Sequence, residues 1–245
     1  MQIYRSIIIP AYSEEKFIGS TLTSLYAFLL GNNWLEDTEV IVVTADPKDN
    51  TIGTVSREIT KFPINQHLKP GARVGKGRDV RLGLTAAKGD CALFMDADLA
   101  TPLEYLIPAF SALEMSGGMV MGVRELSKMH KTITRRISSR LSNTLVRLVV
   151  GFDIADSQCG FKGFDRNALE VILPRSKITG WGFDFEFIKI AKTHKLNISF
   201  VPVPKWHDPK AAGEGLVGDS QFDAMKQTLK ELLMVKKNQI KGKYK

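Results

Sequence analysis

The sequence has few cysteines and no long apolar run. Its 245 residues include two cysteines, Cys91 and Cys159, which is too few for the disulfide framework of a small secreted protein. Both lie in apolar stretches, so we expect reduced thiols in a core. No apolar run approaches the roughly 18 residues of a membrane-spanning helix, and the first residues lack the apolar segment of a signal peptide. We therefore expect a cytoplasmic protein that meets a membrane only at its surface.

The composition is that of an ordinary globular chain, with 44% hydrophobic and 24% charged residues. These values argue against disorder, and the length suits one large α/β domain or two small ones. We assign residues 1–220 to a main domain and residues 221–245 to a C-terminal amphipathic helix with a basic tail.

The net charge of +8 is concentrated in two segments. Residues 124–150 contain seven Lys and Arg against Glu125, and residues 226–245 contain seven Lys against Glu231. Such patches attract anionic lipid head groups, nucleic acid or phosphorylated substrates. A solvated face and a frayed tail are the plainer explanation, which we favour beyond Gln239. No nucleic-acid-binding module is recognisable, so we expect no nucleic-acid partner.

Short apolar runs alternate with amphipathic segments through the first half of the chain. This alternation predicts a mostly parallel sheet with helices on both faces, in which ligands bind beyond the carboxyl ends of the strands. Ser13 is the expected N-cap of the first helix. The predicted strands cover residues 7–9, 40–43, 64–68, 93–95, 161–164 and 198–203. One helix is predicted to begin near residue 14, and residues 75–87 are predicted to form a loop and then a helix. Further helices are predicted over 51–62, 133–150 and 183–194.

Asp96-Ala97-Asp98 follows a predicted strand and is the sharpest chemical signal. Residues two apart in extended backbone point the same way, so both carboxylates are expected to face one cleft. Such a pair suits Mg²⁺ or Mn²⁺ bound together with substrate phosphates, where the metal neutralises charge on a departing diphosphate. A solvated turn is the competing interpretation, but the position after a buried strand favours function.

Lys76 stands between Gly75 and Gly77. The motif fails as a P-loop, because only three residues separate Gly71 from Gly75 and no Ser or Thr follows the lysine. A kinase or an ATPase is therefore not expected. A lysine that binds a diphosphate and a flexible loop before a helix fit the pattern equally well.

Four further segments place charged or titratable residues beside apolar ones. In the predicted helix over 133–150, an arginine row beside an apolar face suits a phosphate with an apolar tail, although a surface helix with a basic side is commoner. Asp184 and Glu186 stand among aromatic residues, where a carboxylate is either functional or paired. His207 is more often structural than catalytic in such a loop. The C-terminal helix carries an apolar stripe that also fits docking on the core: Phe222, Met225, Leu229, Leu232 and Leu233.

Taken in this order, the pieces resemble the family 2 glycosyltransferases, most closely the dolichyl-phosphate mannose synthases, the dolichyl-phosphate glucosyltransferases and their bacterial polyprenyl-phosphate relatives. The resemblance spans about residues 6–222. The stretches that carry it are 7–15, 75–77, 94–102, 135–143, 156–164 and 182–186.

The resemblance implies a GT-A fold and an inverting transfer of a hexose, glucose or mannose, from a UDP- or GDP-sugar to a polyprenyl phosphate such as dolichyl or undecaprenyl phosphate. A relative that acts on a soluble or protein-linked acceptor, and a catalytically silent nucleotide-sugar-binding relative, stay open as alternatives. The resemblance also implies Mg²⁺ or Mn²⁺ as cofactor, peripheral attachment to the anionic cytoplasmic face of a membrane, and no obligate protein partner.

The same resemblance assigns roles to individual residues. Asp96 and Asp98 would hold the metal, and Asp98 and Asp184 would act in catalysis, with Asp184 at the donor sugar. Contacts to the nucleotide-sugar would come from Pro10, Tyr12, Glu14, Asp46, Lys76 and Asp96. Contacts to the acceptor phosphate would come from Arg124, Arg135 and Ser139, with Arg136 replacing Arg135 under a small register shift.

Three places depart from the family pattern. Thr44-Ala45-Asp46-Pro47 stands where the family usually has Asp-Asp-Gly-Ser, which leaves base recognition unassigned. Ala100 occupies a position where some relatives carry Gln. Ser220-Gln221 replaces Ser-Lys, so a diphosphate-binding lysine is missing there unless Lys210 substitutes for it.

Overall fold

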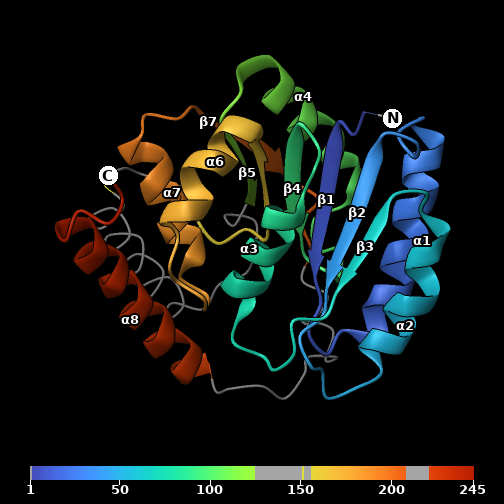
Figure 1. Ribbon diagram of the computed structural model, residues 1–245, viewed down its shortest axis with the longest axis horizontal. Coiled ribbons are helices and arrows are strands. Elements are labelled where there is room, and N and C mark those ends of the chain that lie inside the picture. The colour runs from blue at the N-terminus through green and yellow to red at the C-terminus, as the bar shows by residue number, and fades with distance from the viewer. Residues whose placement is uncertain (1, 125–150, 152–155, 208–220) are drawn as a thin grey trace.

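The computed structural model contains a seven-stranded sheet flanked by helices (Figure 1). It describes residues 2–124, 151, 156–207 and 221–245. The strand order is β3-β2-β1-β4-β6-β5-β7. The strands are β1 (Arg5–Pro10), β2 (Thr38–Val43), β3 (Asn65–Leu68), β4 (Cys91–Met95), β5 (Met119–Arg124), β6 (Phe161–Asp165) and β7 (Ile198–Val203).

Parallel pairing of buried apolar runs builds the centre of the sheet. β1 lies between β2 and β4, with Ile7 opposite Val40 on one side and Leu93 on the other. All three residues are fully buried, as expected for strands covered on both faces. The predicted mostly parallel sheet is therefore confirmed.

β6 is the exception, because it runs antiparallel between β4 and β5. Its first residue, Phe161, lies opposite Met95, the last residue of β4. This register brings the segment before β6 next to the segment after β4, although the two are far apart in the sequence.

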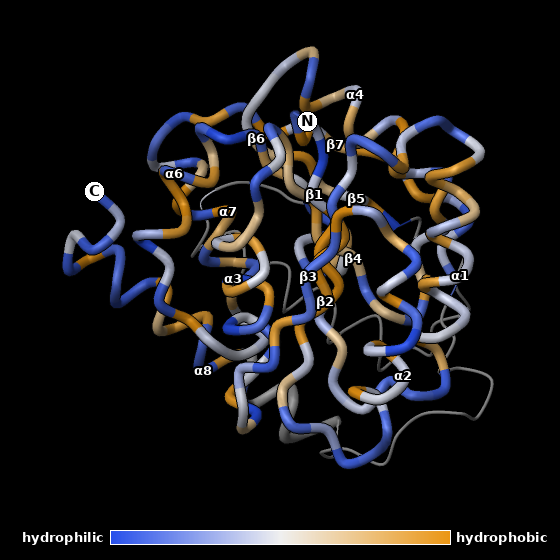
Figure 2. The backbone as a smooth tube through the Cα atoms, turned by 45° about the vertical axis from the view of Figure 1, so that its right-hand side comes forward, coloured by the Kyte–Doolittle hydropathy of each residue, from blue (hydrophilic) through white to orange (hydrophobic). Residues whose placement is uncertain are grey.

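Helices cover both faces of the sheet, as predicted. One core lies under α1 (Glu15–Gly31), α2 (Thr51–Glu58) and α4 (Leu106–Ser116), and the other under α3 (Lys76–Ala86), α6 (Arg166–Arg175), α7 (Phe183–Thr193) and α8 (Gln221–Ile240). Figure 2 shows the hydrophobic residues concentrated along the strands between these layers. Two 3₁₀ turns complete the order, η1 (Ile59–Lys61) and η2 (Leu103–Tyr105).

One strand and two α-helices of the described residues are not predicted by the sequence. α4 is apolar on most sides and lacks a clear stripe. β5 contains a glycine, which is a weak strand former. α6 does carry a usable signal, because Asp165 is its N-cap and accepts a hydrogen bond from the Ala168 amide at 2.7 Å.

The expected cap of α1 is wrong. Glu14 occupies the N-cap position, while Ser13 has a positive φ of 54°. The Ser13 hydroxyl instead accepts a hydrogen bond from the Lys48 amide at 3.0 Å. The residue therefore ties the β1–α1 connection to the segment after β2.

The C-terminal segment also differs from expectation. Leu232 is buried, but Leu229 and Leu233 are 43% and 59% exposed, so only part of the predicted stripe docks on the core. The tail beyond Gln239 is not frayed, because Tyr244 is buried and its hydroxyl donates to Glu186 at 2.8 Å. An aromatic side chain at the end of a basic segment gives the tail an apolar anchor.

Within the described ranges, no helix is both long enough and apolar enough to cross a bilayer.

Candidate active site

One edge of the sheet collects the chemistry-bearing residues. β1, β2, β3, β4, β5 and β7 all run in the same direction, so their carboxyl ends share one edge, where ligands of α/β sheets bind. α3 and α7 begin at this edge and present their N-termini to it. Six predicted residues lie at the last position of these strands or within a few residues after it: Pro10, Tyr12, Asp46, Asp96, Asp98 and Arg124.

Asp96 is held in place by the chain before β6. Its amide donates to the Gly160 carbonyl at 3.1 Å, and a Cβ atom on Gly160 would lie 1.9 Å from the Asp96 Oδ2. The carboxylate thus fills space that exists only because residue 160 is a glycine. The side chain is 31% exposed, so its carboxylate remains open to a ligand.

Asp98 lies in a tight turn. Its Oδ1 accepts a hydrogen bond from the Ala100 amide at 3.1 Å, and Leu99 between them has a positive φ of 54°. Thr21 of α1 donates to the Ala97 carbonyl at 2.6 Å. These bonds fix the turn that places both acids after β4.

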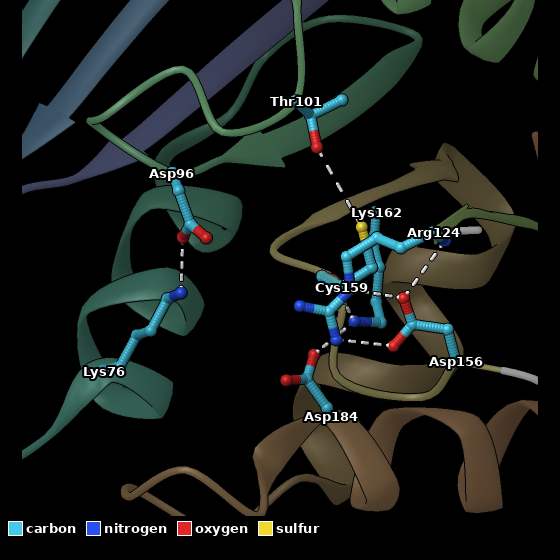
Figure 3. Close-up of polar contacts among 8 residues, drawn as sticks. All are labelled: Lys76, Asp96, Thr101, Arg124, Asp156, Cys159, Lys162 and Asp184. Atoms are coloured by element: carbon cyan, nitrogen blue, oxygen red, sulfur yellow. Dashed lines mark hydrogen bonds and ion pairs between the residues drawn. The ribbon is translucent and has the colours of Figure 1, made fainter. Parts of the chain in front are cut away.

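Lys76, at the first position of α3, forms an ion pair with Asp96 (Figure 3). Its Nζ lies 5.4 Å from the centre of the Trp181 ring. Burial alone would lower the pKa of Lys76, but Asp96, Asp184 and Asp98 raise it above its ordinary value. The lysine is therefore a stable cation that faces three carboxylates.

Asp184 and Lys162 form a buried pair. The Lys162 Nζ lies 2.6 Å from the Asp184 Oδ1 and donates to the Cys159 carbonyl at 2.5 Å. Burial raises the pKa of Asp184, and the positive charge of Lys162 opposes that rise. Because Asp184 stands in the first turn of α7, the helix dipole also favours its negative charge.

Arg124 ends β5 and is held by Asp156. Its Nε and Nη2 atoms donate to the two Asp156 carboxylate oxygens at 2.5 and 2.8 Å, and its guanidinium carbon lies 4.9 Å from the centre of the Trp206 ring. A bidentate carboxylate and an aromatic face fix the guanidinium plane. Figure 3 shows Arg124 beside the Lys162–Asp184 pair.

At the other side of the edge, the predicted nucleotide contacts surround the ends of β1 and β2. The Arg73 guanidinium carbon lies 3.9 Å from the centre of the Tyr12 ring. Glu14 donates its amide to the Thr51 hydroxyl at 2.9 Å, and the amide of exposed Asp46 donates to the Gly71 carbonyl at 2.9 Å.

The two acids after β4 fit a divalent cation by their chemistry. Carboxylate oxygens are the hard, anionic donors that Mg²⁺ and Mn²⁺ prefer. Asp96 already pairs with one cation, the side chain of Lys76. No cluster of three or more His, Cys, Asp or Glu occurs in the part of the chain that the structure describes. Asp96 and Asp98 are therefore the residues that would hold a metal beside a substrate diphosphate.

The structure brings some of the residues predicted from the sequence together. Lys76, Asp96, Asp98 and Asp184 come together, and Arg124 lies on the same edge. The predicted helix over 133–150, with Arg135, Arg136 and Ser139, lies outside the described residues. The prediction of buried, unpaired cysteines is confirmed for Cys91 and Cys159.

Three residues of the site were not singled out from the sequence: Lys162, Trp181 and Arg73. Lys162 stands in a strand, where a lysine is ordinarily read as solvent-facing. Lys162 does lie in the stretch 156–164 that resembles the family, and Trp181 stands between two glycines just before the stretch 182–186. No local pattern marks Arg73.

Comparisons with known proteins show the family and the fold. A model of the family described as Glycosyl transferase family 2 matches residues 6–173. Dolichyl-phosphate beta-glucosyltransferase ALG5C of Trichomonas vaginalis is 30% identical over 234 residues, covering 90% of this chain and 66% of that protein. The dolichyl-phosphate beta-glucosyltransferase of Saccharomyces cerevisiae is 30% identical over 246 residues, covering 89% and 71%. The chain thus spans about two thirds of the length of the first of these relatives.

Solved structures resemble the fold. Glucosyl-3-phosphoglycerate synthase from Mycobacterium tuberculosis, in complex with Mn²⁺, UDP-glucose and phosphoglyceric acid, superposes with a TM-score of 0.68 at 18% identity, covering 95% of this chain and 79% of that one. The predicted GT-A fold is confirmed.

Proposed function

Because the chain belongs to glycosyl transferase family 2, we propose that it transfers a hexose from a nucleotide-sugar to the phosphate of a polyprenyl lipid. The meeting of Asp96, Asp98 and Lys76 at the carboxyl edge of the sheet carries this proposal. Relatives named as dolichyl-phosphate glucosyltransferases favour glucose as the sugar. A structural relative solved with UDP-glucose and Mn²⁺ favours UDP as the carrier and a divalent metal as cofactor.

The donor diphosphate is proposed to lie between α3 and the two acids after β4. There Lys76 would exchange Asp96 for a phosphate oxygen, and Asp96 and Asp98 would hold the metal. Bound in this way, the metal supplies charge neutralisation for the departing diphosphate. Pro10, Tyr12, Glu14 and Asp46 are proposed to line the nucleotide end of the cleft.

The acceptor phosphate is proposed to lie near Arg124. A phosphate monoester has a second pKa near 6, so its oxygen is anionic at neutral pH and attacks without a strong general base. In-line attack on the anomeric carbon inverts its configuration, through a transition state with oxocarbenium character. Asp184, kept in place by Lys162, is proposed to stand at the donor sugar and to stabilise the positive charge that develops there.

Attachment to the cytoplasmic face of a membrane is part of the proposal. The net charge of +8 favours approach to anionic lipid head groups. Co-sedimentation with vesicles of anionic lipid that weakens as salt is raised would support this attachment.

The test is turnover of UDP-glucose with a short polyprenyl phosphate and Mn²⁺, in wild type and Asp98→Asn. We expect the variant to lose roughly 100-fold or more in kcat, because it removes one carboxylate charge at the reacting diphosphate. Asp90→Asn is the matched control, since Asp90 is exposed at the amino end of β4.

Three outcomes would contradict parts of the proposal. Unchanged metal-dependent turnover in Asp98→Asn would remove the assigned role of the two acids. Transfer to a soluble acceptor alone would replace the lipid acceptor. Failure of the wild type to bind UDP-glucose or GDP-mannose with Mn²⁺ in calorimetry would indicate a catalytically silent relative.

A further inference from the structure

Glu231 of α8 is a buried acid to which the proposed chemistry gives no part. It is 8% exposed, and its Oε2 accepts a hydrogen bond from the amide of Gly182, the N-cap residue of α7. Gln227, one turn earlier on α8, donates to its other oxygen at 3.2 Å. A carboxylate of the C-terminal helix therefore caps the helix that carries Asp184.

The fit between Glu231 and the turn over residues 180–182 depends on two glycines. A Cβ atom on Gly180 would lie 1.9 Å from the Glu231 Oε1, and one on Gly182 would lie 2.6 Å from the Glu231 Cβ. The turn packs directly against α8 because both positions lack side chains.

The other side of the same turn packs against α3. A Cβ atom on Gly77 would lie 2.8 Å from the Gly180 carbonyl oxygen. The Arg78 amide donates to the Thr179 carbonyl at 3.1 Å. The turn is thus enclosed between α8 and the first turn of α3, which carries Lys76.

Two groups of the candidate site are placed by this turn, because Trp181 lies within it and Asp184 follows it in α7. The ring of Trp181 lies 5.4 Å from the Lys76 Nζ, and Asp184 pairs with Lys162 at 2.6 Å. We propose that Glu231 is a positioning residue for the donor side of the site, which holds the 180–182 turn and through it Trp181 and Asp184. The proposal rests on the function given above, and Glu231 itself touches no reacting group.

The test compares Glu231→Ala, Glu231→Gln and Val235→Ala. Val235 is buried on the same helix, so its truncation loosens the packing of α8 but keeps the carboxylate. We expect Glu231→Ala to raise the KM for UDP-glucose about tenfold, in the range seen when supporting hydrogen bonds of a site are lost, with the KM for the acceptor unchanged. Glu231→Gln retains an acceptor oxygen and should restore most of the loss.

Val235→Ala is expected to lower the Tm without changing the KM for the donor. An unchanged donor KM in Glu231→Ala, or an equal rise in Val235→Ala, would overturn the proposal.

A second readout does not depend on activity. Trp181 is 43% exposed, and the difference between each protein and its Trp181→Phe counterpart isolates the fluorescence of this residue. Glu231→Ala should increase acrylamide quenching of Trp181, whereas Glu231→Gln and Val235→Ala should not. Unchanged quenching in Glu231→Ala would overturn the proposal. If the wild type fails to bind UDP-glucose while the quenching still rises, the proposed function fails and the anchoring of the turn stands.

Discussion

Gly160 and Asp96 show how one missing side chain shapes the candidate site. Asp96 Oδ2 would lie 1.9 Å from a Cβ atom on residue 160, a separation that real contacts do not allow. Substitution must therefore move either the carboxylate or the backbone before β6. A shift of the backbone lowers the free energy of unfolding, whereas a shift of the carboxylate lowers the activity.

We expect Gly160→Ala to lower kcat about 100-fold, because a displacement of about 1 Å at a reacting group has that effect. Steady-state turnover and the Tm are measured on the same preparation. Gly31→Ala is the control, because a Cβ atom there meets no neighbour within 4 Å. Wild-type activity in Gly160→Ala would show that Asp96 does not need its observed position.

Lys76 places a positive charge on a carboxylate that is proposed to bind metal. Lys76→Met should therefore tighten Mn²⁺ binding in the absence of donor by roughly tenfold, since one opposing charge at ion-pair distance is removed. The same substitution should weaken binding of UDP in the presence of Mn²⁺. Calorimetry measures both, with exposed Lys88→Met as the control. Equal changes of one sign in both titrations would contradict the proposed exchange of partners.

The sequence predicted the site acids Asp96 and Asp98 better than it predicted the buried lysine, Lys162. Asp96 and Asp98 follow a buried strand at a spacing of two, a local pattern that carries its own geometry. Lys162 is marked by no such pattern. Its burial depends on β6 lying between two other strands and on Asp184 approaching from α7, and neither contact is local in sequence.

Among the strands, β3 lies at an edge of the sheet. Its His67 contacts Thr44, the residue that follows β2. The His67 Nε2 lies 2.8 Å from the Thr44 hydroxyl. Burial, with a smaller effect of Lys69, lowers the pKa of His67 from 6.5 to about 4. In the pH range between these values the unfolded chain therefore binds more protons at this residue than the native protein does.

Stability is thus expected to fall as the pH is lowered from about 6.5 to about 4. The contribution of His67 is fully present above pH 6.5 and is lost as the pH falls through the folded pKa. Urea unfolding across this range, in wild type and His67→Gln, measures it. Carboxylates titrate in the same range in both proteins, so the difference between the two curves isolates His67. Parallel curves would show that the histidine is not the cause.

Elements were predictable where periodicity was strong. The runs at 7–9, 40–43 and 93–95 lie within β1, β2 and β4, and the boundaries of β7 agree with the prediction. α7 was also predicted, although residues 183–191 are buried on every side. Its acids, Asp184 and Glu186, are buried and have buried partners. The spacing of apolar residues along a helix does not reveal such pairing.

At the scale of the whole molecule, both cysteines report on the integrity of the core. Burial raises the pKa of Cys91 and of Cys159 to about 11. A thiolate is the reactive form of cysteine, so labelling of the native protein at pH 8 should be about 100-fold slower than labelling of the unfolded chain. Ellman's reagent measures both rates, and urea should release two thiols per chain. Rapid labelling of one thiol in the native protein would reveal local opening of the core.

The order of the strands in the sheet could not be predicted from the sequence. Alternating strands and helices predicted a parallel sheet, but the pairing of β6 with β4 and β5 is set by contacts between distant segments. The assignment of residues 221–245 to a separate C-terminal segment stays a prediction. In the described part of α8, Leu232 and Val235 share a core with α7.

The antiparallel position of β6 between β4 and β5 affects how the protein folds while it is being synthesised. β4 and β5 leave the exit tunnel first, yet each pairs with β6, and β4 and β5 do not pair with each other. Until residue 165 has emerged, both strands keep open edges that invite wrong partners. Nascent chains from which residue 124 has emerged and residue 165 has not should therefore depend most on chaperones.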